Sequence, residues 1–539
     1  MNQTAVKTLR MHKPGQRLVA TLALASIFVG SFGPASIAQA GYAQATGYFR
    51  ARDYASAATE FFQAYAYPKE KGEKRKSEFG LAQSLQQLNM YYAASKYYSL
   101  IVRRGPKEDN PFFTKALDEL GNINAVLSLG QSHIVQLFKT PIEPSAIPGR
   151  AKGFYFYYQG AEAFNKRAFE EAKPFFDKVP SGSPYYLRAL LHLGVIANIS
   201  GRQSAAISYF ERVIRGAGDD EMGEFLREVA NLNVARVHYE ARRYREALAF
   251  YNQIPRDSDS WLQAIFESAW AFFMYQKHNN VLGQIHTLHS PFFENRFYPE
   301  SYVLQAITFL RLCRYDQVKI SLQKFRERYG PVFADVRDML RKYDGDSKGF
   351  FNLIYKYRTG ELNSYKNAWS ILDSVSRMDP YKEAGDTIRF ADREIARLSS
   401  FQGKWASSGL QDDLVKFLQD KKRLAIGDAG RRLYDSSRDS YEYLQNLSSQ
   451  TKLINAEMLL GKIDQLRAKI NVGTTEKKVN FIGGMTQLSV GDELEYWPFQ
   501  KEYWEDELGA YVFNIDSVCG RKAGGKKGED GNAKDKEKE

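Results

Sequence analysis

The 539-residue sequence has few of the residues from which catalytic and metal sites are built: two cysteines and seven histidines. His286 and His289 stand three residues apart, but no cysteine and no third histidine lies near them, so the pair does not predict a metal site. The sequence has no Gly-x-Ser-x-Gly nucleophile elbow, and its glycine–lysine run at 524–527 lacks the flanking strand and helix of a phosphate loop. We therefore expect no catalytic residue, no metal, no cofactor and no enzymatic activity.

Proline is scarce as well, with 17 residues, whereas aromatic residues make up 14% of the chain. This composition leaves room for long helices and suits helix pairs with interlocking bulky side chains. A disulfide between Cys313 and Cys519 is allowed in an oxidising compartment. Because Cys313 falls inside a helix pattern and Cys519 lies near the tail, we expect two unpaired thiols, with Cys313 as a small buried hydrophobe.

The first 40 residues have the pattern of an export signal. Four basic residues and no acidic residue accompany an apolar stretch, Leu18–Phe32, that is too short to span a bilayer comfortably. Ala38-Gln39-Ala40 then gives the small-x-small pattern of a signal-peptidase site, which predicts cleavage after Ala40 and a periplasmic location. A non-cleaved anchor helix is the alternative, and the glycines and proline in the segment argue against it.

The formal charge of +12 falls to 12 − 4 = +8 without residues 1–40, and the basic residues are interspersed with 63 acidic ones. Nucleic-acid binding requires clustered Lys and Arg, so we do not expect a nucleic-acid partner. No later run of 18 or more apolar residues occurs, which predicts a mature chain without a transmembrane segment. A peripheral association with the membrane or with peptidoglycan stays open.

Small and aromatic residues recur at fixed spacings along residues 45–330. Gly160 and Gly194 are 34 residues apart, and so are Ala172 and Ala206. Five units have an alanine followed four residues later by an aromatic residue: Ala57/Phe61, Ala94/Tyr98, Ala172/Phe176, Ala206/Phe210 and Ala247/Tyr251. Two further units have aliphatic pairs at these positions, Val281/Ile285 and Val318/Leu322.

This template resembles that of the tetratricopeptide-repeat (TPR) family, in which each 34-residue unit is a pair of antiparallel helices. The resemblance implies an all-α superhelical solenoid. Small residues such as Gly160 and Gly194 would let the first helix approach the second, and the aromatic residue would fill the space beneath. The step from Gly194 to Ala235 is 41 residues, which predicts an insertion near 216–218.

Seven segments follow from these patterns. They are a signal peptide (1–40), N-terminal TPR units (41–108), a degenerate helical pair with a Pro-rich loop (109–150), the main TPR array (151–332), long helices (333–478), an aromatic-rich C-terminal segment (479–520) and a disordered tail (521–539).

Two interpretations stay open for each of the segments 333–478 and 479–520. Leu453, Leu460 and Ile463 belong to a series with alternating steps of three and four, which is typical of a coiled coil but equally of a helical hairpin packed against the array. In 479–520, Val479–Ile482 predicts a strand, and the aromatic cluster that begins at Tyr496 predicts a small β-containing cap on the solenoid or else a docking surface.

The resemblance to TPR proteins implies that the first helix of each unit lines a groove that binds protein segments. By this template the candidate partner-binding residues are Phe154, Tyr157, Asn165, Asn198, Arg236, Tyr239, Trp270 and Phe273. Packing of these side chains against neighbouring units is the alternative.

The signal peptide, the aromatic-rich array and the C-terminal aromatic segment together resemble periplasmic TPR proteins of gliding and predatory Gram-negative bacteria. The resemblance implies a scaffold for protein–protein interactions in a cell-envelope complex, with a motility complex as one setting. The alternatives are an outer-membrane assembly or peptidoglycan-associated coordinator, and a hydrolase with a TPR appendage, for which 340–518 offers no nucleophile motif.

Overall fold

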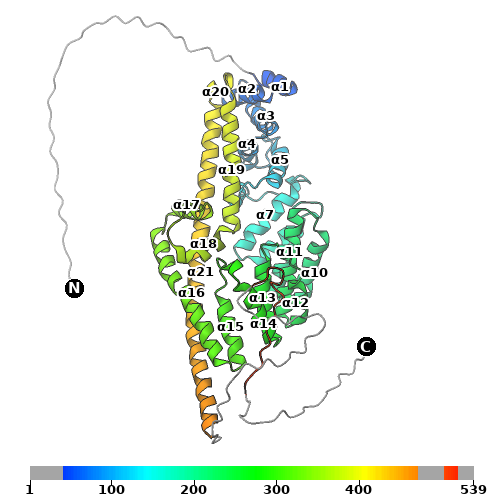
Figure 1. Ribbon diagram of the computed structural model, residues 1–539. Helices are drawn as coiled ribbons and strands as arrows, with labels where there is room; N and C mark the ends of the chain where they lie inside the picture. Colours follow the sequence, from blue (N-terminus) through cyan, green and yellow to red (C-terminus); the bar gives the residue numbers. More distant parts are fainter. Residues whose placement is uncertain (1–40, 472–502, 520–539) are drawn as a thin grey trace, which may run out of the picture. The chain divides into compact units, whose positions relative to one another are not determined.

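The computed structural model describes residues 41–471 and 503–519 (Figure 1). The predictions for 1–40, for Val479–Ile482, for the cluster at Tyr496 and for the tail 521–539 fall outside these residues. Helices, turns and loops make up 41–471, and 503–519 is an extended segment with a short turn. Neither described range contains a strand, so the β-containing cap is not supported.

Most of the chain is a succession of antiparallel helix pairs, in which successive helices pack against each other, α5 and α6 excepted. The paired helices are α1 (Tyr42–Arg50), α2 (Tyr54–Ala66), α3 (Glu73–Gln87), α4 (Tyr91–Arg103), α5 (Phe113–Val126), α6 (Gln131–Leu137), α7 (Lys152–Asn165), α8 (Phe169–Asp177), α9 (Tyr186–Ile199), α10 (Gln203–Gly216), α11 (Glu221–Glu240), α12 (Tyr244–Tyr251), α13 (Trp261–Met274), α14 (His278–Leu288), α15 (Glu300–Arg311) and α16 (Tyr315–Lys342).

One backbone conformation recurs in the turn between the two helices of a pair. In seven pairs one turn residue has φ between 56° and 73°, namely Arg52, Asn89, Arg167, Gly201, Arg242, Gln276 and Cys313. Left-handed backbone costs a non-glycine residue about 1 kcal/mol or more, so its recurrence at equivalent positions indicates one repeated unit. The part of the chain from α1 to α16 is therefore an array of TPR-type helix pairs, as predicted.

The packing within the pairs also follows the template. A Cβ atom on Gly160 would lie 2.8 Å from the Phe176 ring, and one on Gly194 would lie 2.4 Å from the Phe210 ring. The small residue thus lets the two helices of a pair approach until the aromatic ring covers the first helix. The alanines of the second helices are fully buried: Ala57, Ala94, Ala172, Ala206 and Ala247.

The long step between Gly194 and Ala235 agrees with an insertion near 216–218, and the extra residues are helical. The loop after α10 is short, and α11 has 20 residues where α9 has 14. Six of the seven extra residues therefore extend the first helix of that unit at its N-terminal end.

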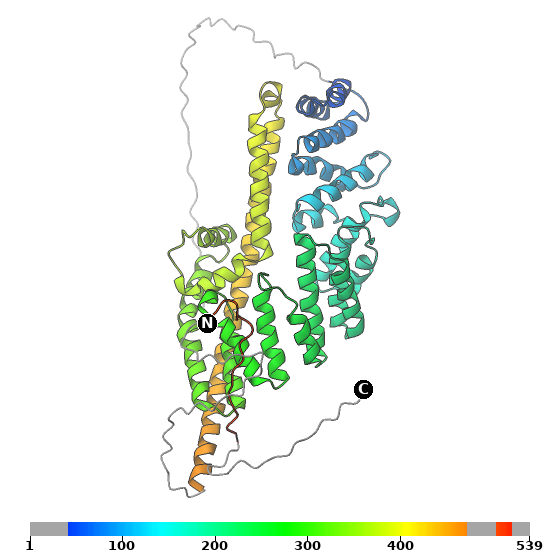
Figure 2. The same cartoon turned by 45° about the vertical axis from the view of Figure 1, so that its right-hand side comes forward.

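After the array, the chain folds back along it. α17 (Ser347–Arg358) and α18 (Trp369–Ser376) lead into α19 (Asp379–Ser400), the short α20 (Lys404–Ser407) and α21 (Leu410–Asn471). α19 and α21 lie side by side in both views (Figures 1 and 2). This hairpin contacts α4 near its tip and α15–α18 further along α21, so it bridges the two ends of the array. The boundary predicted at 332/333 lies inside α16, which runs without interruption to Lys342.

Of the two alternatives for the long helices, the structure contains the hairpin packed against the array. Ile454 and Met458 are buried against it, whereas Leu453 and Leu460 lie on the opposite, exposed face of α21.

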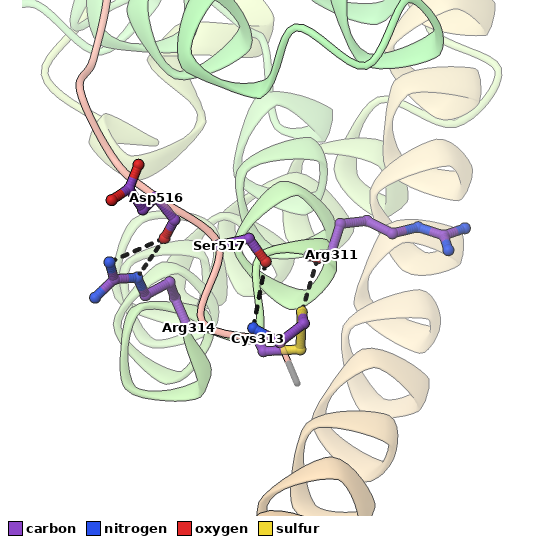
Figure 3. Close-up of a disulfide and its surroundings, with 6 residues drawn as sticks. Arg311, Cys313, Arg314, Asp516 and Ser517 are labelled. Atoms are coloured by element: carbon purple, nitrogen blue, oxygen red, sulfur yellow. Dashed lines mark hydrogen bonds between the residues drawn. A yellow bond between two sulfur atoms is a disulfide. The ribbon is translucent and has the colours of Figure 1, made fainter. Parts of the chain in front are cut away.

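Residues 503–519 lie across α14 and end in a disulfide between Cys519 and Cys313 (Figure 3). The expectation of two unpaired thiols is therefore wrong. Cys313 does not lie inside a helix: it is the left-handed residue of the α15–α16 turn, which places its side chain at the surface, within reach of the C-terminal segment. The described part of the aromatic segment packs along α13 and α14 and reaches the α15–α16 turn.

Candidate protein-interaction surface

Polar side chains link several first helices to the first helix of the next unit. Gln86 of α3 donates to Glu119 of α5 at 2.8 Å, and Asn198 of α9 donates to Glu240 of α11 at 2.8 Å. Asn124 of α5 donates to the hydroxyl of Tyr158 of α7 at 2.9 Å. These bonds cross the surface on which the candidate residues lie, so part of that surface serves the stability of the array.

Phe154 and Tyr157 both lie on α7, but the two side chains differ in how deeply they are buried. Phe154 is 1% exposed, and its ring centroid lies 5.3 Å from that of Phe138. The residue faces Gly121 of α5, whose missing side chain leaves room for the ring, so we exclude Phe154 from the candidate surface. Tyr157 is half-buried and stacks on Tyr185 of the next unit at 5.4 Å. Burial raises the pKa of the Tyr157 hydroxyl to about 12.

The two candidate amides differ in their surroundings. Asn165 is the last residue of α7 and is exposed. Asn198 is half-buried, and its amide nitrogen is occupied by Glu240. Asn165 is therefore open to a partner, whereas Asn198 would have to exchange its bond with Glu240.

Arg236 and Tyr239 lie on α11 and contact residues of this array. Both guanidinium nitrogens Nε and Nη2 of Arg236 donate to the Glu267 carboxylate of α13, at 2.9 and 2.6 Å. Burial would lower the pKa of Arg236, but hydrogen bonds and the charge of Glu267 outweigh it and raise this pKa. Tyr239 is half-buried, and its ring packs edge-on against Tyr244.

Trp270 and Phe273 form a half-buried pair on α13. Their rings meet edge to face at 5.7 Å, and Phe273 also contacts His278 of α14. The next residue, Met274, is 45% exposed. An aromatic pair with an exposed apolar neighbour is the kind of surface that supplies a binding hot spot.

The structure adds apolar positions at the ends of the first helices. Ile199 ends α9 and is 56% exposed, and Met274 and Tyr275 at the end of α13 are 45% and 44% exposed. Ile199 is 34 residues after Asn165, and Met274 is 34 residues after Glu240, so these four residues are equivalent. The same spacing that revealed the repeat could therefore have found Met274. We call Asn165, Ile199, Tyr239, Trp270, Phe273 and Met274 the first-helix surface.

The histidines that stand three apart in sequence have structural partners. His289 shares a 2.8 Å hydrogen bond with Ser301 and stacks on Tyr302 at 4.0 Å. Burial lowers the pKa of His289 to about 3 and that of His286 to about 4. Across 41–471 and 503–519, no group of three or more His, Cys, Asp or Glu side chains has the arrangement of a metal site. The described helices include none that is long and apolar enough to cross a membrane.

Comparisons with known proteins give no family. The sequence matches no family model and no curated protein sequence. Among solved structures, the crystal structure of the apo form of RapI aligns over 65% of this chain and 96% of that chain, with 10% identity and a TM-score of 0.33. A TM-score this low carries no argument about function, and the TPR-type assignment rests on the repeated turns and helix pairs described above.

Proposed function

We propose that this protein is an exported helical-repeat scaffold that binds segments of other proteins on its first-helix surface. The observation that carries the proposal is the position of Ile199 and Met274, which are exposed apolar residues at equivalent places in different units. Between and beside them lie the half-buried rings of Tyr239, Trp270 and Phe273. A surface with several apolar and aromatic side chains suits an extended or helical peptide.

The proposed location is the periplasm of a Gram-negative cell, and the proposed setting is a protein complex of the envelope, a motility complex being one candidate. The support is the export pattern of residues 1–40 and the resemblance of the aromatic-rich array to periplasmic TPR proteins. N-terminal sequencing of the protein from its own host is expected to start at Gly41. A chain that keeps Met1, or that fractionates with the cytoplasm, would contradict export.

Binding is tested by crosslinking in intact envelopes, capture of the mature protein and mass spectrometry of the captured proteins. Met274→Asp and Trp270→Ala are expected to lose the same captured protein, because truncating a hot-spot aromatic residue costs about 2 kcal/mol or more. The control is Ala247→Leu, which overpacks the fully buried contact within one pair and is expected to cost about 1–3 kcal/mol of stability.

The two kinds of variant separate binding from folding. Met274→Asp and Trp270→Ala should keep the melting temperature of the parent, whereas Ala247→Leu should lower it. If Trp270→Ala melts the array as strongly as Ala247→Leu and binding per folded molecule is unchanged, Trp270 belongs to the core and the first-helix surface is not the binding site.

A further inference from the structure

The C-terminal segment 503–519 is bound to the array like a peptide ligand. Leu508 is 4% exposed and is buried in the apolar cluster that includes Trp261 and Ile265 of α13. The next residue, Gly509, makes two main-chain hydrogen bonds with α14: its N–H donates to Thr287 Oγ1 at 2.8 Å, and its carbonyl accepts from Gln284 Nε2 at 2.9 Å. Leu508-Gly509 is therefore anchored by one apolar contact and two polar ones.

α14 has no side chain where the segment crosses it. A Cβ atom on Gly283 would lie 1.6 Å from the carbonyl oxygen of Tyr511, so only glycine permits this approach. Past the crossing, the Phe513 N–H donates to the Asn279 carbonyl at 3.1 Å and the Ile515 N–H donates to Asn279 Oδ1 at 3.0 Å. The surface of α14 at this crossing therefore fits an extended main chain and accepts hydrogen bonds from its N–H groups.

Aromatic contacts and the last residues complete the contact surface. The rings of Tyr511 and Phe513 lie 4.9 and 5.7 Å from His286 of α14. Arg314 donates to the Asp516 carbonyl at 2.9 Å, and Cys519 forms the disulfide with Cys313 (Figure 3). Main-chain hydrogen bonds together with pockets for alternate side chains are the usual means by which proteins bind extended peptides.

The segment is also not held there by a short connection. Thirty-one residues, 472–502, separate α21 from it, and that length of chain reaches about 100 Å when extended. The same segment is therefore long enough to reach a second molecule. Its binding site consists of α13, α14 and the α15–α16 turn, all of which lie within one chain.

We propose that this surface, the α14 peptide site, is a binding site for extended segments with the pattern Leu-Gly-x-Tyr-x-Phe, and that it accepts residues 508–513 of a second copy of this chain in exchange for its own. The proposal does not depend on the first-helix surface, because the residues of α13 that it uses, Trp261 and Ile265, are not part of that surface.

The first test uses the full-length chain with its own segment weakened by Leu508→Asp and Cys519→Ser, which leaves a free Cys313. A synthetic peptide of residues 503–519 is added with its cysteine as a mixed disulfide with glutathione. The Cys313 thiolate attacks the peptide sulfur and releases glutathione thiolate, so the peptide becomes attached through a new disulfide. Intact mass spectrometry measures the rate.

The wild-type peptide is expected to attach at least about tenfold faster than the same peptide carrying Leu508→Asp, a ratio that corresponds to about 1.4 kcal/mol. Adding Gly283→Ala to the chain should remove the difference. Gly330→Ala should leave it unchanged, because a Cβ atom at Gly330 meets no atom within 4 Å. Equal rates for the two peptides would overturn the site.

The second test asks whether a second copy supplies the segment. The chain with Leu508→Asp and Cys519→Ser is mixed with a full-length Cys313→Ser chain, whose Cys519 is free, in oxidised glutathione as the oxidant. A crosslinked dimer joined by Cys313 of one copy and Cys519 of the other is expected on a non-reducing gel, and Gly283→Ala in the first chain should abolish it. Peptide attachment without this dimer would overturn the exchange between copies.

Discussion

At the scale of single residues, the array depends on positions where no side chain fits. Gly194 lies in α9 directly against the Phe210 ring of α10, and an added Cβ atom would lie 2.4 Å from that ring. Gly194→Ala is therefore expected to destabilise the protein by about 1–3 kcal/mol, the usual cost of overpacking a filled core. The melting temperature in a thermal scan should fall accordingly.

Gly385→Ala is the matched control, because Gly385 also lies inside a helix, α19, but a Cβ atom there meets no atom within 4 Å. Alanine lowers the conformational entropy of the unfolded chain and is expected to raise stability by about 0.5–1 kcal/mol. If the two variants melt at the same temperature, the close packing of α9 on α10 is not what makes glycine necessary.

At the scale of elements, a buried carboxylate joins the hairpin to the array. The two Glu394 oxygens of α19 accept the main-chain N–H groups of Tyr92 and Ala93 in the first turn of α4, at 2.8 and 2.9 Å. These N–H groups have no partner within their own helix, so Glu394 satisfies them from another element. Lys421 of α21 lies nearby and donates to the Leu129 carbonyl at 2.9 Å.

Burial raises the pKa of Glu394 from 4.5 to about 7, although its hydrogen bonds and Lys421 oppose the shift. The folded protein therefore holds a proton on Glu394 between pH 4.5 and 7 that the unfolded chain has lost, so this group's contribution to stability falls as the pH rises through that range. In the Glu394→Gln variant the side chain is an amide, which does not titrate. The difference in melting temperature, parent minus variant, is expected to be larger at pH 5 than at pH 7.5, and a constant difference would contradict the role of Glu394.

The elements also show what could be read from the sequence. The helix pairs were predictable because Ala172/Phe176 and its equivalents repeat a packing requirement within one unit. The place of α21 was not, because the spacing of Leu453 and Leu460 gives a helical face but not its neighbour; the face with Ile454 is the buried one. The repeat register places Cys313 in the turn, because it stands five residues before Val318 as Arg242 stands before Ala247. Its proximity to Cys519, 206 residues away, has no signal in the sequence.

The candidate surface was predictable only in part, because a sequence pattern gives a helical face but not its neighbour. The template places Phe154 and Trp270 on first helices, but it does not say which neighbour covers them. Phe154 is covered because Gly121 of the preceding first helix leaves space for its ring, whereas Trp270 is only half-buried.

At the scale of the whole molecule, α21 takes part in two separate hydrophobic cores. Leu414 and Leu418 are fully buried in the core that includes the N-terminal helix pairs, and Leu433 and Leu444 are fully buried in the core built on α15–α18. A repeat array usually unfolds in parts, since each unit contacts only its neighbours. A helix shared by two distant cores couples them, because losing either contact exposes apolar surface on the same helix.

Leu418→Asp tests this coupling. A charge buried without a partner in the N-terminal core is expected to cost about 3 kcal/mol or more and to detach the tip of the hairpin from α4. Hydrogen-exchange mass spectrometry should then show faster exchange in peptides from 41–108 and, because α21 is shared by both cores, also in peptides from α16. Leu424→Asp is the control on the same helix, since Leu424 is 69% exposed. If Leu418→Asp speeds exchange in 41–108 alone, α21 does not couple the two cores. If it speeds exchange in neither region, the hairpin does not stabilise the N-terminal pairs.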